Sequence, residues 1–309
     1  MKTAHLSQKG FTALQVGVVI LLFFLLSFIA FVFFGDRESD WLKTEYDKAI
    51  AKTRHVQTMR SELLASAEAE KSSVMADTDE ASKAFAQQSE RASQNVENAR
   101  IAFETLIKNS DEAKPFDEFS ACWRKLREID TQILSLAVQN TNLKALRLSL
   151  GPAAAEMKRM QEALNEMIDR AAEAHRDGAE VIRLAASALI TAQNIYMLTV
   201  PHIVETTDAE MDGIEAKMRQ LDERVRNALK RLEPLVGGAD KPLFVDAWNS
   251  YRAVHAINKE IVDLSRQNSN IRSFSESLGQ KRQTMIMCLS YLDALQEVVQ
   301  ENATCKATR

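Results

Sequence analysis

Glycine, proline and aromatic residues are scarce in this sequence of 309 residues, which has nine Gly, five Pro and 6% aromatic residues. So few turn formers cannot separate the many strands of an all-β or α/β chain. Ala, Glu, Lys, Arg, Leu and Gln are plentiful instead, and these residues favour helices. The composition therefore predicts an all-α protein of long helices, with a length that allows about two domains.

The sequence also lacks a strong excess of charge, since its formal net charge is −4 and acids and bases are interspersed. Without a basic stripe, we expect no nucleic-acid partner. Its three cysteines, Cys122, Cys288 and Cys305, are an odd number without metal-ligand or redox spacing. No disulfide framework, zinc site or haem motif can be read from them.

Motifs for catalysis are missing as well. No two of the five histidines share a helix face at metal-ligand spacing, and there is no Gly-rich phosphate loop or nucleophile motif. Acidic residues are scattered at spacings typical of solvated helix surfaces. The sequence therefore predicts that the protein is not an enzyme and binds no cofactor or metal.

One long apolar run is present near the N-terminus. No charged residue occurs from Gly10 to Gly35, and residues 16–34 approach the roughly 20 residues with which a helix crosses a bilayer. Lysines precede the run and acidic residues follow it, which places the N-terminus in the cytoplasm. We expect an uncleaved single-pass anchor in the inner (cytoplasmic) membrane through residues 11–34, with the bulk of the chain periplasmic or extracellular.

The segment from Gln8 to Gln15, QKGFTALQ, also resembles the start of type IV prepilins. In that family a short basic leader ends in Gly, and cleavage exposes a Phe that opens a long apolar helix. Family members usually carry Glu at the fifth mature position, where this sequence has Gln15. A pilin-like protein is therefore a minor alternative.

An internal repeat organises the rest of the chain. The segment from Asp130 to Gly151, DTQILSLAVQNTNLKALRLSLG, returns from Asn258 to Gly279 as NKEIVDLSRQNSNIRSFSESLG, without a gap and at an offset of 128. The same offset extends the match upstream and, with one slip, further back. The sequence therefore predicts two copies of one helical module.

Helix boundaries within each copy follow from the apolar spacing. The clearest seam alternates steps of three and four residues from Met211 to Leu235, and the corresponding seam of the first copy carries Ser82 and Ser89. Asn tolerates the left-handed backbone and caps helices, so we expect one helix to end and another to begin at two matched sites. These sites are Asn140 with Asn142, and Asn268 with Asn270.

Four amphipathic helices per copy, joined by short turns, predict two tandem up-down-up-down four-helix bundles after one transmembrane helix. The predicted segments are 1–35 for the cytoplasmic N-terminus and anchor, 36–175 and 176–302 for the bundles, and 303–309 for a polar tail. A turn is expected around Asp177. We also expect the two bundles to pair within the chain through residues 55–67 and 183–195.

These residues carry a family resemblance. The chain from about Asp36 to Asn302 resembles, in two copies, the four-helix-bundle ligand-binding domain of methyl-accepting chemotaxis proteins. The motif residues are Phe119, Trp123, Leu136, Asn140, Asn142 and Gly151, and then Trp248, Tyr251, Leu264, Asn268, Asn270 and Gly279. The resemblance implies a domain that senses small molecules outside the membrane, or binds a periplasmic solute-binding protein, and that acts as a dimer.

The family's second span, adaptor domain and methylated coiled coil are not seen in the sequence. We therefore expect a membrane-anchored extracytoplasmic sensory or ligand-binding module of chemoreceptor type without its own cytoplasmic signalling domain, which acts through a separate signalling protein. The alternative is a helical scaffold that binds another protein at the membrane surface, with no small-molecule ligand.

Candidate ligand-binding residues are few. Lys281 occupies a seam position that Ala153 holds in the other copy, and a buried ammonium needs a partner or an escape to the surface. We favour the escape. If Lys281 instead meets a ligand carboxylate, Arg60 and Arg183 are the other candidate cations, and the ligand is a small organic acid or amino acid.

Overall fold

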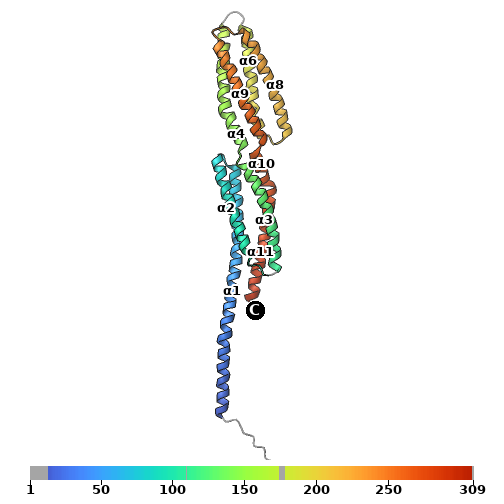
Figure 1. Ribbon diagram of the computed structural model, residues 1–309. Coiled ribbons are helices and arrows are strands. Elements are labelled where there is room, and N and C mark those ends of the chain that lie inside the picture. Colours follow the sequence, from blue (N-terminus) through green and yellow to red (C-terminus); the bar gives the residue numbers. More distant parts are fainter. Residues whose placement is uncertain (1–12, 109, 174–177, 308–309) are drawn as a thin grey trace, which may run out of the picture. The chain divides into compact units, whose positions relative to one another are not determined.

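The computed structural model describes residues 13–108, 110–173 and 178–307, and in that part of the chain it contains helices and connecting turns but no strand (Figure 1). The predicted all-α class is confirmed. The elements are α1 (Ala13–Met75), α2 (Asp79–Glu104), α3 (Ser110–Ala137), α4 (Thr141–Leu148), η1 (Ser149–Ala153), α5 (Ala154–Glu173), α6 (Gly178–Met197), α7 (Thr199–Val204), α8 (Asp208–Leu232), η2 (Glu233–Leu235), α9 (Lys241–Gln267), α10 (Ser269–Glu276), η3 (Ser277–Lys281) and α11 (Arg282–Ala307). Of these, η1 and η3 are π-helical turns and η2 is a 3-10 turn.

The chain forms two compact units. The first unit comprises Met1–Arg60, Glu97–Phe119 and Ser290–Arg309, and the second comprises Ser61–Val96 and Ser120–Leu289. Each unit takes residues from both copies of the repeat. This division differs from the predicted one, which placed a single boundary between residues 175 and 176.

In the first unit, aromatic packing and one buried carboxylate join the helices. The rings of Phe103 in α2 and Phe116 in α3 stack with centroids 5.5 Å apart. Glu112 in α3 is buried, and it accepts hydrogen bonds from Lys52 in α1 at 2.5 Å and from Asn302 in α11 at 3.3 Å. Four chain segments therefore share one interior.

The predicted membrane span begins outside the described residues, and α1 covers it from Ala13. The side chains from Leu21 to Leu25 are all exposed. In the part of the chain that was searched, the segment Gly178–Val204 is long and apolar enough to cross a membrane by length and composition. Six side chains of α6 are buried, so the apolar character of that segment has a second explanation in core packing.

Within the second unit, α5, α6, α8 and α9 form one four-helix group, which we call the groove bundle. Helix α6 packs on α5 and α8, α5 packs on α9, and α8 meets α9 at only a few points. Its interior is the predicted apolar seam: Met157, Met160, Leu164, Met167, Leu184, Ala188, Met218, Leu221, Val225, Leu229, Phe244, Tyr251 and Val254 are among the buried residues. The side of the group between α8 and α9 is therefore its open side.

Another four-helix group in the second unit has a polar seam; we call it the disulfide bundle. It consists of the parts of α1, α2, α3 and α11 that fall in residues 61–96, 120–137 and 282–289, together with η3. The Ser66 hydroxyl lies 3.1 Å from that of Ser89 and 2.8 Å from that of Ser93, and Ser82 donates to the Ala137 carbonyl at 3.2 Å. The serines predicted in the first copy's seam are thus buried and hydrogen-bonded.

The two groups show that the copies exchange their fourth helices. After the Asn140 break, α4 and α5 pack on α9 of the second copy (Figure 1). Lys281 and Cys288 of the second copy contact α3. The predicted turn near Asp177 falls largely in residues 174–177, outside the described residues, but it connects α5 and α6 of one bundle. The predicted pair of segregated tandem bundles is therefore corrected to two bundles of mixed composition.

The physical reason lies at the breaks. A single left-handed residue interrupts each long helix without a hairpin loop, so the fourth helix leaves its own three helices and enters the other group. Residues 61–67 lie in the disulfide bundle and residues 183–195 in the groove bundle, so helix exchange, and not the expected pairing of first helices, joins the copies.

Candidate functional site

The candidate site is a groove on the open side of the groove bundle. It encloses about 350 Å³, which falls in the range of small-molecule pockets. Its lining residues come from α6, α8 and α9: Ala192, Ile195, Glu215, Met218, Arg219, Asp222, Glu223, Tyr251, Val254, His255, Asn258, Lys259 and Val262. The groove exists because α8 and α9 diverge where the other neighbouring helices pack closely.

Asn258 is the polar residue in the apolar floor of this groove. It lies on the same face of α9 as Tyr251 and Val254, and it is 8% exposed. Its side-chain oxygen Oδ1 is buried and has no hydrogen-bond partner among the described residues. Leaving such an acceptor unsatisfied costs about 1–3 kcal/mol, so a donor that reached this atom would be favoured.

Asp222 anchors one end of the groove. Its carboxylate accepts hydrogen bonds from the Tyr251 hydroxyl and from Arg226 Nε at 2.7 Å, and His255 Nδ1 lies 3.0 Å away. Burial, followed by the hydrogen bond to Asp222 and then by the charge of that carboxylate, raises the pKa of the Tyr251 phenol well above its ordinary value. The phenol therefore remains a hydrogen-bond donor, and Asp222 is already engaged.

Glu215 anchors the other end. It accepts from Arg266 Nε at 2.6 Å and from the fully buried His202 Nε2 at 3.1 Å, and the second ring nitrogen of His202 lies 2.8 Å from the Ser265 hydroxyl. Burial tends to raise the pKa of the Glu215 carboxyl, but the hydrogen bonds from Arg266 and His202 outweigh burial and lower it. Glu215 is therefore held as a carboxylate.

Both helix breaks meet next to this end of the groove. Asn140 and Asn268 have left-handed backbones with φ of 51° and 52°, which confirms the predicted breaks. The side-chain oxygens that cap the helices after these breaks, however, come from the other copy of the repeat. The backbone N–H of Asn142 donates to Asn270 Oδ1 at 3.1 Å, and that of Asn270 donates to Asn142 Oδ1 at 3.2 Å.

A second reciprocal pair completes this contact, which we call the break pair. The backbone N–H of Thr141 donates to Ser269 Oγ, and that of Ser269 donates to Thr141 Oγ1, both at 3.1 Å. Asn142 Nδ2 also donates to the Ile203 carbonyl at 2.8 Å. Because Ile203 follows His202, the break pair and the Glu215 end of the groove are linked through α7.

Lys281 lies at the end of the π-helical turn η3 and is 3% exposed. Its ammonium donates to Glu70 Oε2 at 2.6 Å and to an oxygen of Asp130. The favoured escape of this side chain to the surface is therefore wrong, since the chain supplies two carboxylates. Glu70 Oε1 is buried without a hydrogen-bond partner among the described residues, and a role of Lys281 in ligand binding stays a prediction.

The other two predicted cations lie elsewhere. Arg183 is exposed on α6 and pairs with Glu180 at 2.5 Å, within the groove bundle but outside the groove lining. Arg60 belongs to the first unit and pairs with Asp293. Arg183 and Lys281 share no ion-pair partner, so the structure does not bring these two together. Their roles in ligand binding likewise stay predictions.

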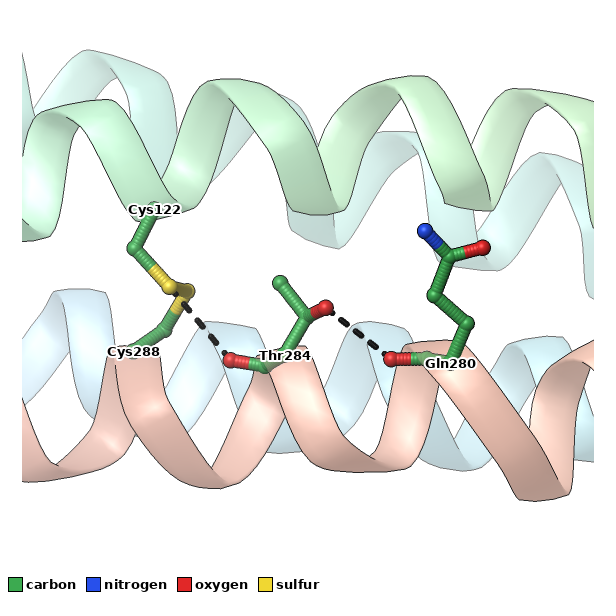
Figure 2. Close-up of a disulfide and its surroundings, with 4 residues drawn as sticks. All are labelled: Cys122, Gln280, Thr284 and Cys288. Atoms are coloured by element: carbon green, nitrogen blue, oxygen red, sulfur yellow. Dashed lines mark hydrogen bonds between the residues drawn. A yellow bond between two sulfur atoms is a disulfide. The ribbon is translucent and has the colours of Figure 1, made fainter.

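A disulfide joins Cys122 in α3 to Cys288 in α11, with Cα atoms 5.5 Å apart (Figure 2). The Cys122 sulfur lies 3.4 Å from the Thr284 carbonyl oxygen, and the Thr284 hydroxyl donates to Gln280. The cysteine spacing did not predict this disulfide. The two cysteines are 166 residues apart in sequence and meet only because the fourth helices are exchanged.

The groove residues were missed by the sequence analysis for a related reason. Tyr251 was noted as a motif residue, but the side chains around it come from α6, α8 and α9. No sequence pattern indicates that α8 and α9 diverge. Asn258 gave a weak signal, since it interrupts an apolar seam with an amide. Within the described residues, no group of three or more His, Cys, Asp or Glu could hold a metal ion.

A family model described as a four helix bundle sensory module for signal transduction matches residues 13–181. The match spans more than half of the 309 residues and ends just inside α6. The resemblance inferred from the sequence is confirmed, and the second copy beyond residue 181 lies outside the match. No curated protein matches the chain.

Proposed function

The chain belongs to the family of four-helix-bundle sensory modules for signal transduction, and we propose that it is a membrane-anchored, extracytoplasmic sensor that binds a small ligand in the groove between α6, α8 and α9. The observation that carries this proposal is the groove itself. The groove has a volume of about 350 Å³ and combines an apolar floor with a buried acceptor, Asn258 Oδ1, that has no partner in the part of the chain that the structure describes. The role is non-catalytic.

The paired charges at the two ends give the groove a defined shape. Glu215 and Asp222 both lie on α8, and residues of α9 hold them through Arg266, His255 and Tyr251. A ligand that bridges α8 and α9 would therefore contact two helices that are already bonded to each other at both ends of the groove. This arrangement supports a sensor in which binding changes the separation of α8 and α9.

A route from the groove to α1 supports signalling. Glu215 bonds to His202, and the adjacent Ile203 carbonyl bonds to Asn142 in the break pair. From the break pair, α10 leads directly into η3, where Lys281 is bonded to Glu70 in α1. We propose that a change at α8 reaches α1 along these contacts.

The ligand site is tested by filling it. The full chain is placed in lipid nanodiscs and screened by thermal shift against organic acids, amino acids, amines and amides. Val262→Phe, at the rim of the groove, should abolish any ligand-dependent shift that the unaltered chain shows. Ala256→Phe, at an exposed position of the same helix, is the matched control and should keep the shift. A shift that survives Val262→Phe would place the ligand elsewhere.

Two observations support the proposed anchor through residues 11–34 and the placement of the bulk of the chain outside the inner membrane. The side chains from Leu21 to Leu25 are exposed on α1, and the disulfide of Cys122 with Cys288 suits an oxidising compartment. A membrane-impermeant thiol probe should label Cys305 in intact spheroplasts, and Cys305→Ser should remove the signal. Labelling that requires lysis would reverse the orientation.

A second candidate, a scaffold that binds another protein, is favoured by one exposed apolar stripe. Ile190, Met197 and Val204 are 58%, 70% and 61% exposed and follow each other at steps of seven residues along α6 and α7. Exposed apolar stripes of this kind mark protein contacts. A photo-crosslinking residue at position 197 should then yield one discrete adduct in membranes, and a probe at position 219 should not.

A further inference from the structure

Resting on that proposed function, we propose that the groove selects a neutral or cationic ligand that carries an N–H or O–H donor on a compact apolar body, and that it rejects carboxylates. The class differs from the organic acids expected from the sequence. It follows from which polar atoms in the groove are already engaged and which one is left.

The floor calls for an apolar body. Ile195 and Met218 contribute apolar side chains from α6 and α8, and Val254 and Val262 contribute them from α9. A ligand methylene that leaves water for such a wall gains about 0.8 kcal/mol. A small branched chain therefore suits the floor, and a highly hydrated ligand does not.

The acceptor in the floor calls for a donor. Asn258 Oδ1 is buried and has no hydrogen-bond partner among the described residues, so a ligand N–H or O–H placed there removes the desolvation cost of an unsatisfied acceptor. A ligand carboxylate at the same point would set two acceptors against each other. The floor itself thus discriminates against anions.

Two of the cations around the groove are committed. Arg226 donates to Asp222 at 2.7 Å, and Arg266 donates to Glu215 at 2.6 Å. Arg219 lies on the rim and pairs with Glu215 at 3.6 Å, and Lys259 is exposed. Arg226 and Arg266 therefore already use guanidinium N–H groups on carboxylates of the groove, which competes with the paired N–H contact by which proteins grip a ligand carboxylate.

The charges at the groove nearly cancel. Glu215, Asp222 and Glu223 supply three negative charges, and Arg219 and Lys259 with the adjoining Arg226 and Arg266 supply four positive charges. Selection against a carboxylate therefore rests on the acceptor in the floor and not on the net charge.

The test uses three probes with one carbon skeleton: isovaleramide, isoamylamine and isovalerate. Titration calorimetry on the full chain in nanodiscs should show binding of the amide and the amine and none of the carboxylate. Asn258→Leu should weaken both by about 5- to 150-fold, because it removes the acceptor from the floor. Asn249→Leu, at an exposed position on the same helix, is the control and should leave both affinities unchanged.

Asn258→Asp decides the direction of the hydrogen bond. The aspartate keeps an acceptor and loses the amide donor, so binding of the amine should persist. Isovalerate that binds the unaltered chain, and is lost in Asn258→Asp, would overturn the ligand class while the groove remains the binding site. Failure of all three probes would also overturn the class. Val262→Phe distinguishes a wrong ligand class from a wrong binding site. If a ligand found in the wider screen still binds to Val262→Phe, the groove is not the ligand site.

Discussion

The groove bundle and the disulfide bundle are both four-helix groups built from the same repeat, yet opposite kinds of side chain hold them together. Apolar residues such as Met160 and Leu229 fill the groove bundle, and two of its helices diverge. The disulfide bundle has buried serines, an ion-pair cluster around Lys281 and the Cys122–Cys288 bond. Apolar contacts are non-directional and can readjust, whereas the hydrogen bonds, ion pairs and disulfide of the disulfide bundle require particular atoms to stay next to each other. One bundle is suited to respond to a ligand and the other to keep its helix register.

The largest expected effect is at Lys281. Lys281→Met should destabilise the protein by about 3–5 kcal/mol, because it leaves the carboxylates of Glu70 and Asp130 buried without their cation. Chemical denaturation of the full chain in nanodiscs measures the change. Arg183→Met is the matched control in the groove bundle. It removes an exposed ion pair with Glu180 and should cost at most about 1 kcal/mol.

A second substitution guards this result against a simple packing explanation. Lys281→Met combined with Glu70→Gln and Asp130→Asn removes both orphaned charges, and it should recover much of the lost stability. If Lys281→Met costs no more than Arg183→Met, the cluster does not hold the bundle and the comparison loses its main support.

Breaking the disulfide should have the next largest effect. Cys122→Ala with Cys288→Ala should cost about 2–5 kcal/mol, because a crosslink across 166 residues restricts the unfolded chain. Amide hydrogen exchange should show the loss first at residues 120–137 of α3 and less at α8. Equal loss in both helices would mean that the two bundles unfold as one, and that the disulfide serves them equally.

The sequence predicted the helices well because apolar spacing and capping residues act locally. The seam from Met211 to Leu232, the buried serines and the breaks at Asn140 and Asn268 appear where the pattern placed them, whereas Leu235, the predicted last residue of that seam, is exposed. The exchange of fourth helices was not predictable in this way. Matched seams fit either copy equally well, because a repeat gives both bundles the same interior positions.

The candidate site could not be predicted from the sequence, because it depends on the exchange of fourth helices and on the divergence of α8 from α9. Cys122 and Cys288 showed no usable spacing, since disulfide geometry depends on which helices are neighbours. Lys281 was correctly singled out as a seam residue, but its carboxylate partners come from α1 and α3, which the tandem arrangement kept away from it. Asn258 can be recognised as a candidate site residue only from the structure, which shows that its side-chain oxygen is buried without a hydrogen-bond partner among the described residues.

The break pair gives a smaller effect that tests the link between the bundles. Asn142→Ala and Asn270→Ala should each cost about 0.5–2 kcal/mol, because each removes the oxygen that caps the other copy's helix. In a double-mutant cycle the two effects should be non-additive, since the residues share one network. Asn249→Ala, at an exposed position of α9, is the control. Strict additivity would mean that the two caps act separately.

The smallest expected effect concerns acid, and it compares one carboxylate from each bundle. The pKa of Glu215 is lowered because hydrogen bonds from Arg266 and His202 outweigh burial, and that of Glu90 is lowered chiefly by its hydrogen bond from Arg127. In both cases the unfolded state binds protons at a higher pH than the folded state. The stability that each group contributes is therefore present above the unfolded pKa, about 4.3, and is lost as pH falls through the lower, folded value.

The two groups differ in exposure: the Glu215 side chain is 19% exposed, and that of Glu90 is 56% exposed, where solvent screens the pair. The stability difference between the unaltered chain and Glu215→Gln should accordingly be largest near neutral pH and should shrink towards zero as the medium is acidified. Glu90→Gln should give a flatter and smaller curve. Denaturation midpoints measured across this range decide the matter. A Glu215→Gln difference that is constant with pH would show that the carboxylate charge does not tether α8 to α9, and that the groove keeps its shape through apolar packing alone.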